Sequence, residues 1–204
     1  MDPLPCLTGL FVGKNKLSGA IDHVCVLTGL RHLALFETLF TGSIPPQLPS
    51  CLSHLTLLSL EKNQLTGIIP EDIGALAQLR VLNLSFNQLT GPVANSICEL
   101  KLCEEIDLSH NELDGFIPAR IGDLGERLMW LHLSHNSLDQ SLPDSIYELT
   151  QLEELNISSN KLNGVVDFRV RAFLNLEFLG LSGNRFTFID KESVFSLPLL
   201  CDYN

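Results

Sequence analysis

The sequence predicts an α/β solenoid, in which short coils stack to form a concave parallel β-sheet on one side and loops or short 3-10 turns on the convex side. The first observation is composition: leucine supplies 42 of the 204 residues, whereas aromatic residues make up 7%. The second is a repeated residue that returns every 23 to 25 positions along nearly the whole chain. Thr38 occupies this position in the second repeat. The other seven repeats have asparagine there: Asn15, Asn63, Asn87, Asn111, Asn136, Asn160 and Asn184. A fixed period of this length is typical of repeat architectures.

The segment before each asparagine predicts a short strand. Apolar residues stand three, five and eight positions before it, as Leu84, Leu82 and Leu79 do before Asn87. The alternation of apolar and polar residues in Leu82-Asn83-Leu84 is typical of a strand with one buried face. We therefore expect one strand of about five residues in each coil.

The segment after each asparagine predicts a departure from the sheet. Copies such as residues 65–70 and 113–118 contain a glycine, which permits positive φ, and a proline, which favours an extended turn. Segments such as Ile73-Gly74-Ala75-Leu76 follow, and they are long enough for a single helical turn. One coil therefore closes about every 24 residues.

A single coil cannot bury its own leucines, so the coils must stack. We expect one domain over residues 1–204, with eight repeats and a partial ninth at residues 197–204. The repeated asparagine amide can donate to and accept from the backbone of adjacent turns, which would satisfy buried peptide groups. Thr38 has one hydroxyl donor, and the second coil should be the most loosely held.

These residues resemble the leucine-rich repeat proteins, and in particular the plant-specific class with the pattern LxxLxLxxNxLxGxIPxxIGxL. Residues 67–74 and 115–122 match that pattern closely, and residues 41–45 match part of it. The resemblance covers residues 4 to 204 and implies a right-handed superhelix. It also implies a non-catalytic module that binds a protein or peptide on its concave sheet, as in receptor-like kinases, receptor-like proteins or polygalacturonase inhibitors.

The chain departs from this class at both ends. It enters the first predicted strand almost at once, at Leu10-Phe11-Val12, without the capping segment and cysteine pair of family ectodomains. Its last coil stops at Asn204. Uncapped apolar ends would favour self-association, or a larger receptor of which this chain is a fragment.

Six cysteines are present, and several occupy positions where other repeats carry a hydrophobic residue. The repeat positions of Cys25, Cys51, Cys103 and Cys201 favour reduced, buried thiols. Two other arrangements stay open: a Cys98–Cys103 disulfide within one coil, and terminal disulfides that involve Cys6 or Cys201.

The strand register predicts which side chains face a ligand. The sole tryptophan, Trp130, falls on the concave face between Glu105 and Glu154. The residues that we expect to bind a partner are Trp130, Glu104, Glu105, Asp107, His132, His135, Glu153 and Glu154. Tryptophan is enriched in binding hot spots, and a field of carboxylates favours a basic partner. The alternative is that these acidic residues only keep a large sheet soluble.

Two further patterns fall on the same face. His110, His132 and His135 lie in adjacent coils, and an ordinary polar surface role is favoured. A pH-sensitive interface is the next alternative, ahead of a metal site. Asn83 and Asn156 begin Asn-x-Ser sequons, so they are candidate glycosylation sites, although a repeat spelled LxLSxN creates such sequons by chance.

The remaining composition excludes several functions. The net charge of −11 argues against nucleic-acid binding, and no apolar run is long enough to span a membrane. No phosphate loop, nucleophile elbow or HExxH motif is present, so we expect neither an enzyme nor a cofactor. The sequence is compatible with an extracellular or cell-surface receptor-like module. It is equally compatible with an intracellular scaffold or adaptor, because no export signal precedes the repeats.

Overall fold

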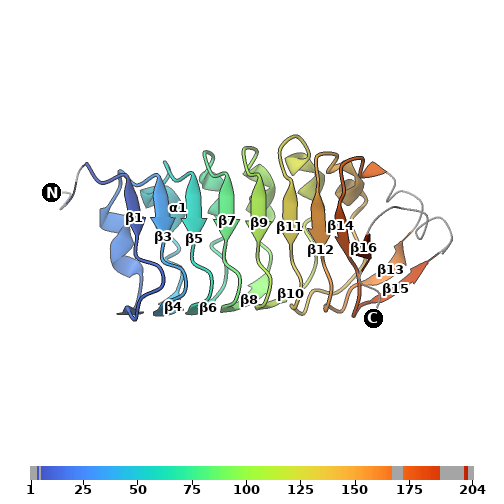
Figure 1. Cartoon of the computed structure of the whole chain (residues 1–204), viewed down its shortest axis with the longest axis horizontal. Coiled ribbons are helices and arrows are strands. Elements are labelled where there is room, and N and C mark those ends of the chain that lie inside the picture. The colour runs from blue at the N-terminus through green and yellow to red at the C-terminus, as the bar shows by residue number, and fades with distance from the viewer. Residues whose placement is uncertain (1–3, 5, 167–171, 189–199, 202–204) are drawn as a thin grey trace.

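The computed structural model describes residues 4, 6–166, 172–188 and 200–201, and these residues form a solenoid of stacked coils (Figure 1). Each coil contributes a strand to one long parallel sheet, and most then contribute a strand to a second layer and a short helical turn on the convex side. The solenoid predicted from the repeat period is therefore confirmed.

Within the described residues, the concave sheet has nine parallel strands in chain order, as the repeat requires. They are β1 (Gly9–Phe11), β3 (His32–Ala34), β5 (Leu57–Ser59), β7 (Val81–Asn83), β9 (Glu105–Asp107), β11 (Trp130–His132), β12 (Glu154–Asn156), β14 (Phe178–Gly180) and β16 (Leu200–Cys201). Each is only two or three residues long, shorter than the five residues expected. The central residue of each of the first eight points into the core, and the flanking residues face the concave surface.

A second layer of strands follows the repeated asparagines. Its five-stranded sheet consists of β2 (Ser18–Gly19), β4 (Leu39–Ser43), β6 (Gln64–Gly67), β8 (Gln88–Pro92) and β10 (Glu112–Asp114), and a separate pair consists of β13 (Asn163–Val166) and β15 (Arg185–Phe188). The turn glycines have positive φ, for example +77° at Gly67 and +75° at Gly91. A side chain in that conformation is strained, which explains why most repeats have glycine there; in the sixth coil Gln140 takes this position with φ of 69°.

The convex side carries single helical turns, as the Ile-Gly-x-Leu segments predict. These are the 3-10 turns η1 (Asp22–Val26), η2 (Ile73–Ala75), η3 (Asn95–Glu99), η4 (Ile121–Leu124) and η5 (Asp144–Glu148), and the four-residue helix α1 (Leu48–Cys51). Their apolar residues pack with the strand leucines in one continuous core, in which Leu58, Leu82 and Ile106 are fully buried.

The repeated asparagines link neighbouring coils. Asn111 is representative: its Nδ2 donates to Leu84 O in the preceding coil and to Leu108 O and Ser109 O in its own, and its Oδ1 accepts from Leu89 N. Asn63, Asn87, Asn136, Asn160 and Asn184 make equivalent bonds. Asn15, in the first coil, donates only to Val12 O and Gly13 O among the described contacts.

Thr38 breaks this pattern. Its Oγ1 lies within hydrogen-bond distance of Leu35 O and of Asn63 Oδ1, in its own coil and in the third. Among the described contacts it makes no bond to the first coil. The junction between the first and second coils therefore lacks the amide link of the central junctions.

The expectation of reduced thiols is wrong for Cys25 and Cys51, which form a disulfide. Cys25 belongs to η1 and Cys51 to α1, on the convex sides of adjacent coils, with their Cα atoms 5.4 Å apart. Both positions suit a core hydrophobic residue. The two cysteines are 26 residues apart, close to the length of one coil, so they lie on neighbouring convex turns where they can meet.

The other cysteines fit the prediction more closely. Cys98 and Cys103 are buried and free, so the alternative disulfide between them does not form. Burial raises the pKa of Cys98 to about 11 and that of Cys103 to about 12, which makes both thiols unreactive. Cys6 is exposed and free, and the side chain of Cys201 lies outside the described residues.

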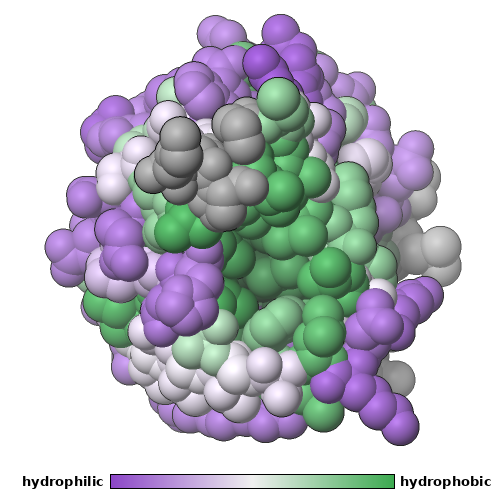
Figure 2. Space-filling model, turned by 90° about the vertical axis from the view of Figure 1, so that its left-hand side faces the viewer, coloured by the Kyte–Doolittle hydropathy of each residue, from purple (hydrophilic) through white to green (hydrophobic). Residues whose placement is uncertain are grey.

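The N-terminal end of the solenoid exposes apolar side chains, which form the green centre of Figure 2. A cleft of about 300 Å³ opens there between residues of the first two coils, including Val12, Leu17, Val24 and Phe40. Self-association through this end stays a prediction. The partial ninth repeat at residues 197–204 lies mostly outside the described residues. Within the described part of the chain, no helix has the length and apolar content needed to cross a bilayer.

Candidate ligand-binding surface

The concave sheet places the predicted acidic residues around Trp130. In the parallel register, Trp130 of β11 pairs with Glu105 of β9 on one side and with Glu154 of β12 on the other. Neighbouring strands lie about 4.8 Å apart, so both carboxylates flank the indole directly. All three side chains are half-buried. The indole is therefore partly accessible, and each neighbouring strand carries a glutamate in register with it.

A second row of polar residues runs beside this one. His132 pairs in register with Asp107 and Asn156, and its Nε2 lies 3.0 Å from Glu154 Oε2. Asp107 Oδ1 accepts a hydrogen bond from Ser109 N at 2.9 Å, which holds that carboxylate against its own strand end. The two rows form one continuous surface, here called the Trp130 patch: Glu105, Asp107, Trp130, His132 and Glu154.

The electrostatics of the Trp130 patch favour a positive charge. Burial, followed by the charge of Asp107, raises the pKa of Glu105. The charge of His132 opposes this shift, and the charges of Glu61 and Glu154 add to it. Repulsion among carboxylates means that a cation placed here would relieve an unfavourable potential. A carboxylate or phosphate would be repelled.

The outer acidic residues differ from one another. Glu104 forms an ion pair with Arg80, so its charge is partly compensated. Glu153 is half-buried and has no ion pair among the described residues. Glu153 therefore contributes to the negative potential more directly than Glu104 does.

The three histidines do not form one cluster. His110 and His135 stack with ring centroids 4.1 Å apart, and Phe86 stacks on the other face of His110 at 4.0 Å. His132 pairs with Glu154 instead. Phe86, His110 and His135 all have φ of 53°, in the left-handed region, because each directly precedes a repeated asparagine. Burial, followed by the charge of His135, lowers the pKa of His110.

The sequon asparagines lie in the same row as Asp107 and His132. Asn83 and Asn156 are half-buried, and the Oδ1 of each accepts from the hydroxyl of its sequon serine at 2.7 Å. Asn156 pairs in register with His132, so a glycan there would crowd the Trp130 patch. Glycosylation at either position stays a prediction.

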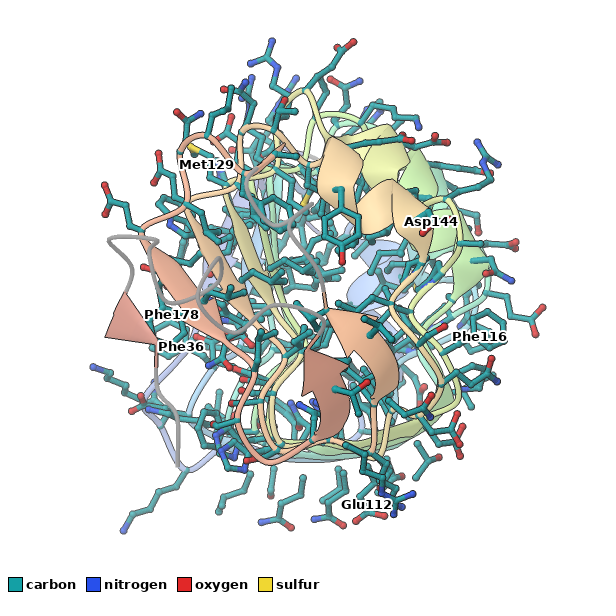
Figure 3. The ribbon with its side chains drawn as sticks, turned by 90° about the vertical axis from the view of Figure 1, so that its right-hand side faces the viewer. Phe36, Glu112, Phe116, Met129, Asp144 and Phe178 are labelled. Carbon is teal, nitrogen blue, oxygen red and sulfur yellow. A yellow bond between two sulfur atoms is a disulfide. The ribbon has the colours of Figure 1, made fainter. Side chains whose placement is uncertain are left out.

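Phe178, which is not among the residues expected to bind a partner, borders the patch. It pairs in register with Glu154 and is half-buried. Figure 3, viewed from the C-terminal end, shows Phe178 and Phe36 on the concave side and Phe116 on the opposite side. The register of the repeats would have indicated Phe178, because it occupies the same column as Trp130.

The patch is suited to binding through contact and charge. Within the described residues, no group of three or more histidine, cysteine, aspartate or glutamate side chains could hold a metal ion. The chemistry on this surface consists of one indole, several carboxylates and an imidazole. It can stack on an apolar or planar group and pair with a cation.

Comparisons with known proteins agree with this architecture. The sequence profile described as leucine rich repeat matches residues 28–89 and 104–162, more than half of the chain. Receptor-like protein 31 of Arabidopsis thaliana is 38% identical over 63 residues, which are 30% of this chain and 7% of that protein. The chain thus spans a small part of the length of this relative.

Solved structures share the fold over most of the chain. The ectodomain of the receptor kinase GASSHO1/SCHENGEN3 from Arabidopsis thaliana, in complex with CASPARIAN STRIP INTEGRITY FACTOR 2, has a TM-score of 0.85 and 33% identity, covering 88% of this chain and 22% of that one. The plant peptide hormone receptor RGFR1 in complex with RGF2 has a TM-score of 0.78 and 32% identity, covering 91% of this chain and 33% of the receptor chain. The chain belongs to the leucine-rich repeat family and is similar to the ectodomains of plant receptors.

Proposed function

We propose that this chain is a non-catalytic recognition module that binds a protein or peptide through the Trp130 patch, and that the ligand presents a lysine or arginine there. The observation that carries the proposal is the register that places Trp130 between Glu105 and Glu154. An aromatic anchor beside desolvated charges is typical of binding hot spots. The complexes of the similar GASSHO1/SCHENGEN3 and RGFR1 ectodomains support this proposal.

The disulfide favours one of the two compartments. Cys25–Cys51 is the kind of bond that persists in an oxidising environment. We therefore place the module at the cell surface or outside the cell rather than with intracellular adaptors. The unreduced protein should be purified from its native source and alkylated in denaturant. Its intact mass should show that two of the six cysteines are not alkylated, because they form the disulfide. Alkylation of all six would contradict this placement.

The single tryptophan makes binding directly observable, because its fluorescence reports on the patch alone. We would select peptides from a displayed random library on the folded chain and titrate the enriched peptides while recording Trp130 emission. The expected peptides contain lysine or arginine, and their replacement by glutamate should abolish the spectral change.

Two variants test the role of the carboxylates. Glu105→Gln and Glu154→Gln should each weaken a selected peptide by about tenfold, because each removes one partner of a partly desolvated ion pair. Glu112→Gln, on the exposed second layer, is the matched control and should bind like the parent. If the enriched peptides lack basic residues, or if both patch variants bind normally, the proposed ligand chemistry is wrong.

The binding should also depend on pH. The pKa of Glu105 is raised, so this side chain becomes fully charged only at a higher pH than an ordinary glutamate. A cationic ligand binds the ionised form better, so affinity should increase as pH rises through that pKa. The dependence should be smaller in Glu105→Gln.

A further inference from the structure

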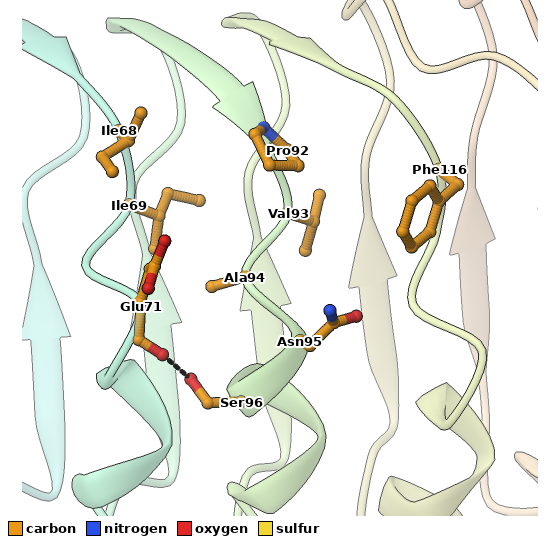
Figure 4. Close-up of a pocket in the computed structure, with 9 residues that line it drawn as sticks. All are labelled: Ile68, Ile69, Glu71, Pro92, Val93, Ala94, Asn95, Ser96 and Phe116. Carbon is orange, nitrogen blue, oxygen red and sulfur yellow. Dashed lines mark hydrogen bonds between the residues drawn. The ribbon is translucent and has the colours of Figure 1, made fainter.

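A hollow of about 390 Å³ lies on the flank of the solenoid, next to the ends of β6 and β8 (Figure 4). Ile68 and Phe116 form its walls, with exposed fractions of 51% and 40%. The buried side chains of Ile69, Val93 and Ala94 form its apolar floor. Phe116 lies on the side of the solenoid away from Phe178, so this hollow is separate from the Trp130 patch (Figure 3).

The hollow results from one irregular coil. The third and fifth coils read Gly-Ile-Ile-Pro and Gly-Phe-Ile-Pro at residues 67–70 and 115–118, whereas the coil between them reads Gly-Pro-Val-Ala at residues 91–94. Pro92 therefore occupies the outward position of Ile68 and Phe116, and Ala94 occupies the position of the prolines. Both replacements are smaller than the residues that stand beside them, which leaves a recess between two bulky walls.

Some polar groups of the hollow have hydrogen-bond partners within the fold, and others have none among the described contacts. The Ser96 hydroxyl donates to the carbonyl oxygen of Glu71, and Ser96 Oγ accepts from Gly74 N at 3.2 Å, so the turns that carry the rim are linked. The Glu71 carboxylate and the Asn95 amide have no hydrogen bond or ion pair among the described contacts. In Figure 4 the Glu71 side chain lies along the recess, and Asn95 is directed toward Phe116.

The chemistry of the lining identifies a class of occupant. An apolar recess with a few converging polar groups is typical of a binding site. No basic residue lines it, so the charge of Glu71 is uncompensated. A basic group is therefore complementary to the rim, and an acidic one would be repelled.

We propose that this hollow is a second binding site, which accepts a bulky apolar side chain of a partner protein between Ile68 and Phe116 while an adjacent lysine or arginine of that partner pairs with Glu71. The apolar side chain would cover Pro92 and Ala94, and Asn95 would hydrogen-bond to the partner backbone. A partner bound here leaves the concave face free, so the module could hold a second protein beside its concave ligand.

Capped dipeptides provide a defined probe. We would label the isoleucine methyl groups of the whole chain and titrate N-acetyl-Leu-Arg-amide while recording methyl NMR spectra. Ile68 and Ile69 should shift saturably, whereas the core residues Ile106 and Ile157 should not. N-acetyl-Leu-Glu-amide and N-acetyl-Ser-Arg-amide should bind at least threefold more weakly, because each lacks one of the two required groups.

Variants complete the test. Glu71→Gln should remove the preference for arginine over glutamate, and Asp72→Asn, which alters the next exposed carboxylate, should not. Phe116→Ser should weaken the Leu-Arg dipeptide at least threefold, and the fold should tolerate it because Ser43 and Ser141 occupy this position in other coils. Unchanged emission from Trp130 would show that the concave face is not involved. Equal shifts with all three dipeptides, no saturable shift, or indifference to Glu71→Gln and Phe116→Ser would each overturn the proposal.

Discussion

The first two coils and the central coils are held together by different contacts. At the central junctions, one asparagine amide per coil bonds to the backbone of two coils, as Asn111 does. At the first junction Thr38 makes no such link to the first coil among the described contacts, and the Cys25–Cys51 disulfide joins the two coils on the convex side. A repeat array can therefore lack the asparagine hydrogen bonds at one junction where a disulfide connects the same two coils.

The N-terminal and central coils also differ in the residues that directly precede the repeated asparagine or threonine. The first three coils carry Lys14, Glu37 and Lys62, and Lys62 forms an exposed ion pair with Glu37. The next three carry the stacked rings of Phe86, His110 and His135. Contacts in the first region should respond to salt and those in the second to pH.

Removal of the disulfide should have the largest effect. The double variant Cys25→Ala/Cys51→Ala should lose about 3 kcal/mol in the free energy of unfolding of the N-terminal coils, because a loop of 26 residues is no longer closed. Hydrogen exchange should show faster exchange in the first two coils and little change beyond Asn87. Addition of a reductant to the variant is the control and should do nothing. Uniform destabilisation of all coils would contradict a local role for the bond.

Removal of a central amide should come next. Asn111→Ala should lower the free energy of unfolding by about 2 kcal/mol, because backbone groups such as Leu84 O and Leu89 N lose a partner within the fold. Urea denaturation would measure the change. Asn163→Ala, at an exposed position, is the matched control and should be nearly neutral. Equal stability of the two variants would mean that the amide links are dispensable.

Restoration of the amide at the first junction should have a smaller and opposite effect. Thr38→Asn should raise the stability of the first two coils by about 1 kcal/mol, because it supplies the missing link to the first coil. The gain should be larger in the background without the disulfide. A loss of stability in both backgrounds would show that the bond from Thr38 to Asn63 matters more than the restored link.

The stacked rings should give the smallest effect. The lowered pKa of His110 means that the unfolded chain takes up a proton at a pH where the folded chain does not. The free energy of unfolding should therefore decrease as pH falls through the ordinary histidine range, although Asp107 nearby opposes the shift. His110→Phe keeps the stack and should reduce this dependence in thermal scans between pH 5 and 8. An unchanged pH profile would contradict the assignment to His110.

The strands, the turns and the register of the concave face follow from the sequence because leucines at fixed intervals leave only one way to bury every coil. The disulfide could not be predicted in the same way, since Cys25 and Cys51 occupy positions that suit a hydrophobic residue equally well. The ring stack depends on the left-handed backbone before each asparagine, which sets a side-chain direction that spacing does not reveal. The flank hollow depends on the displaced proline at position 92, whose effect appears only beside Ile68 and Phe116.

Hydrogen exchange with and without a basic peptide selected on the folded chain would show whether the ligand covers the Trp130 patch. We expect added protection at residues 104–107, 129–132 and 153–156, with no change in the first two coils and none at the flank hollow. Protection confined to the N-terminal coils, or absent from the strands on both sides of Trp130, would contradict it.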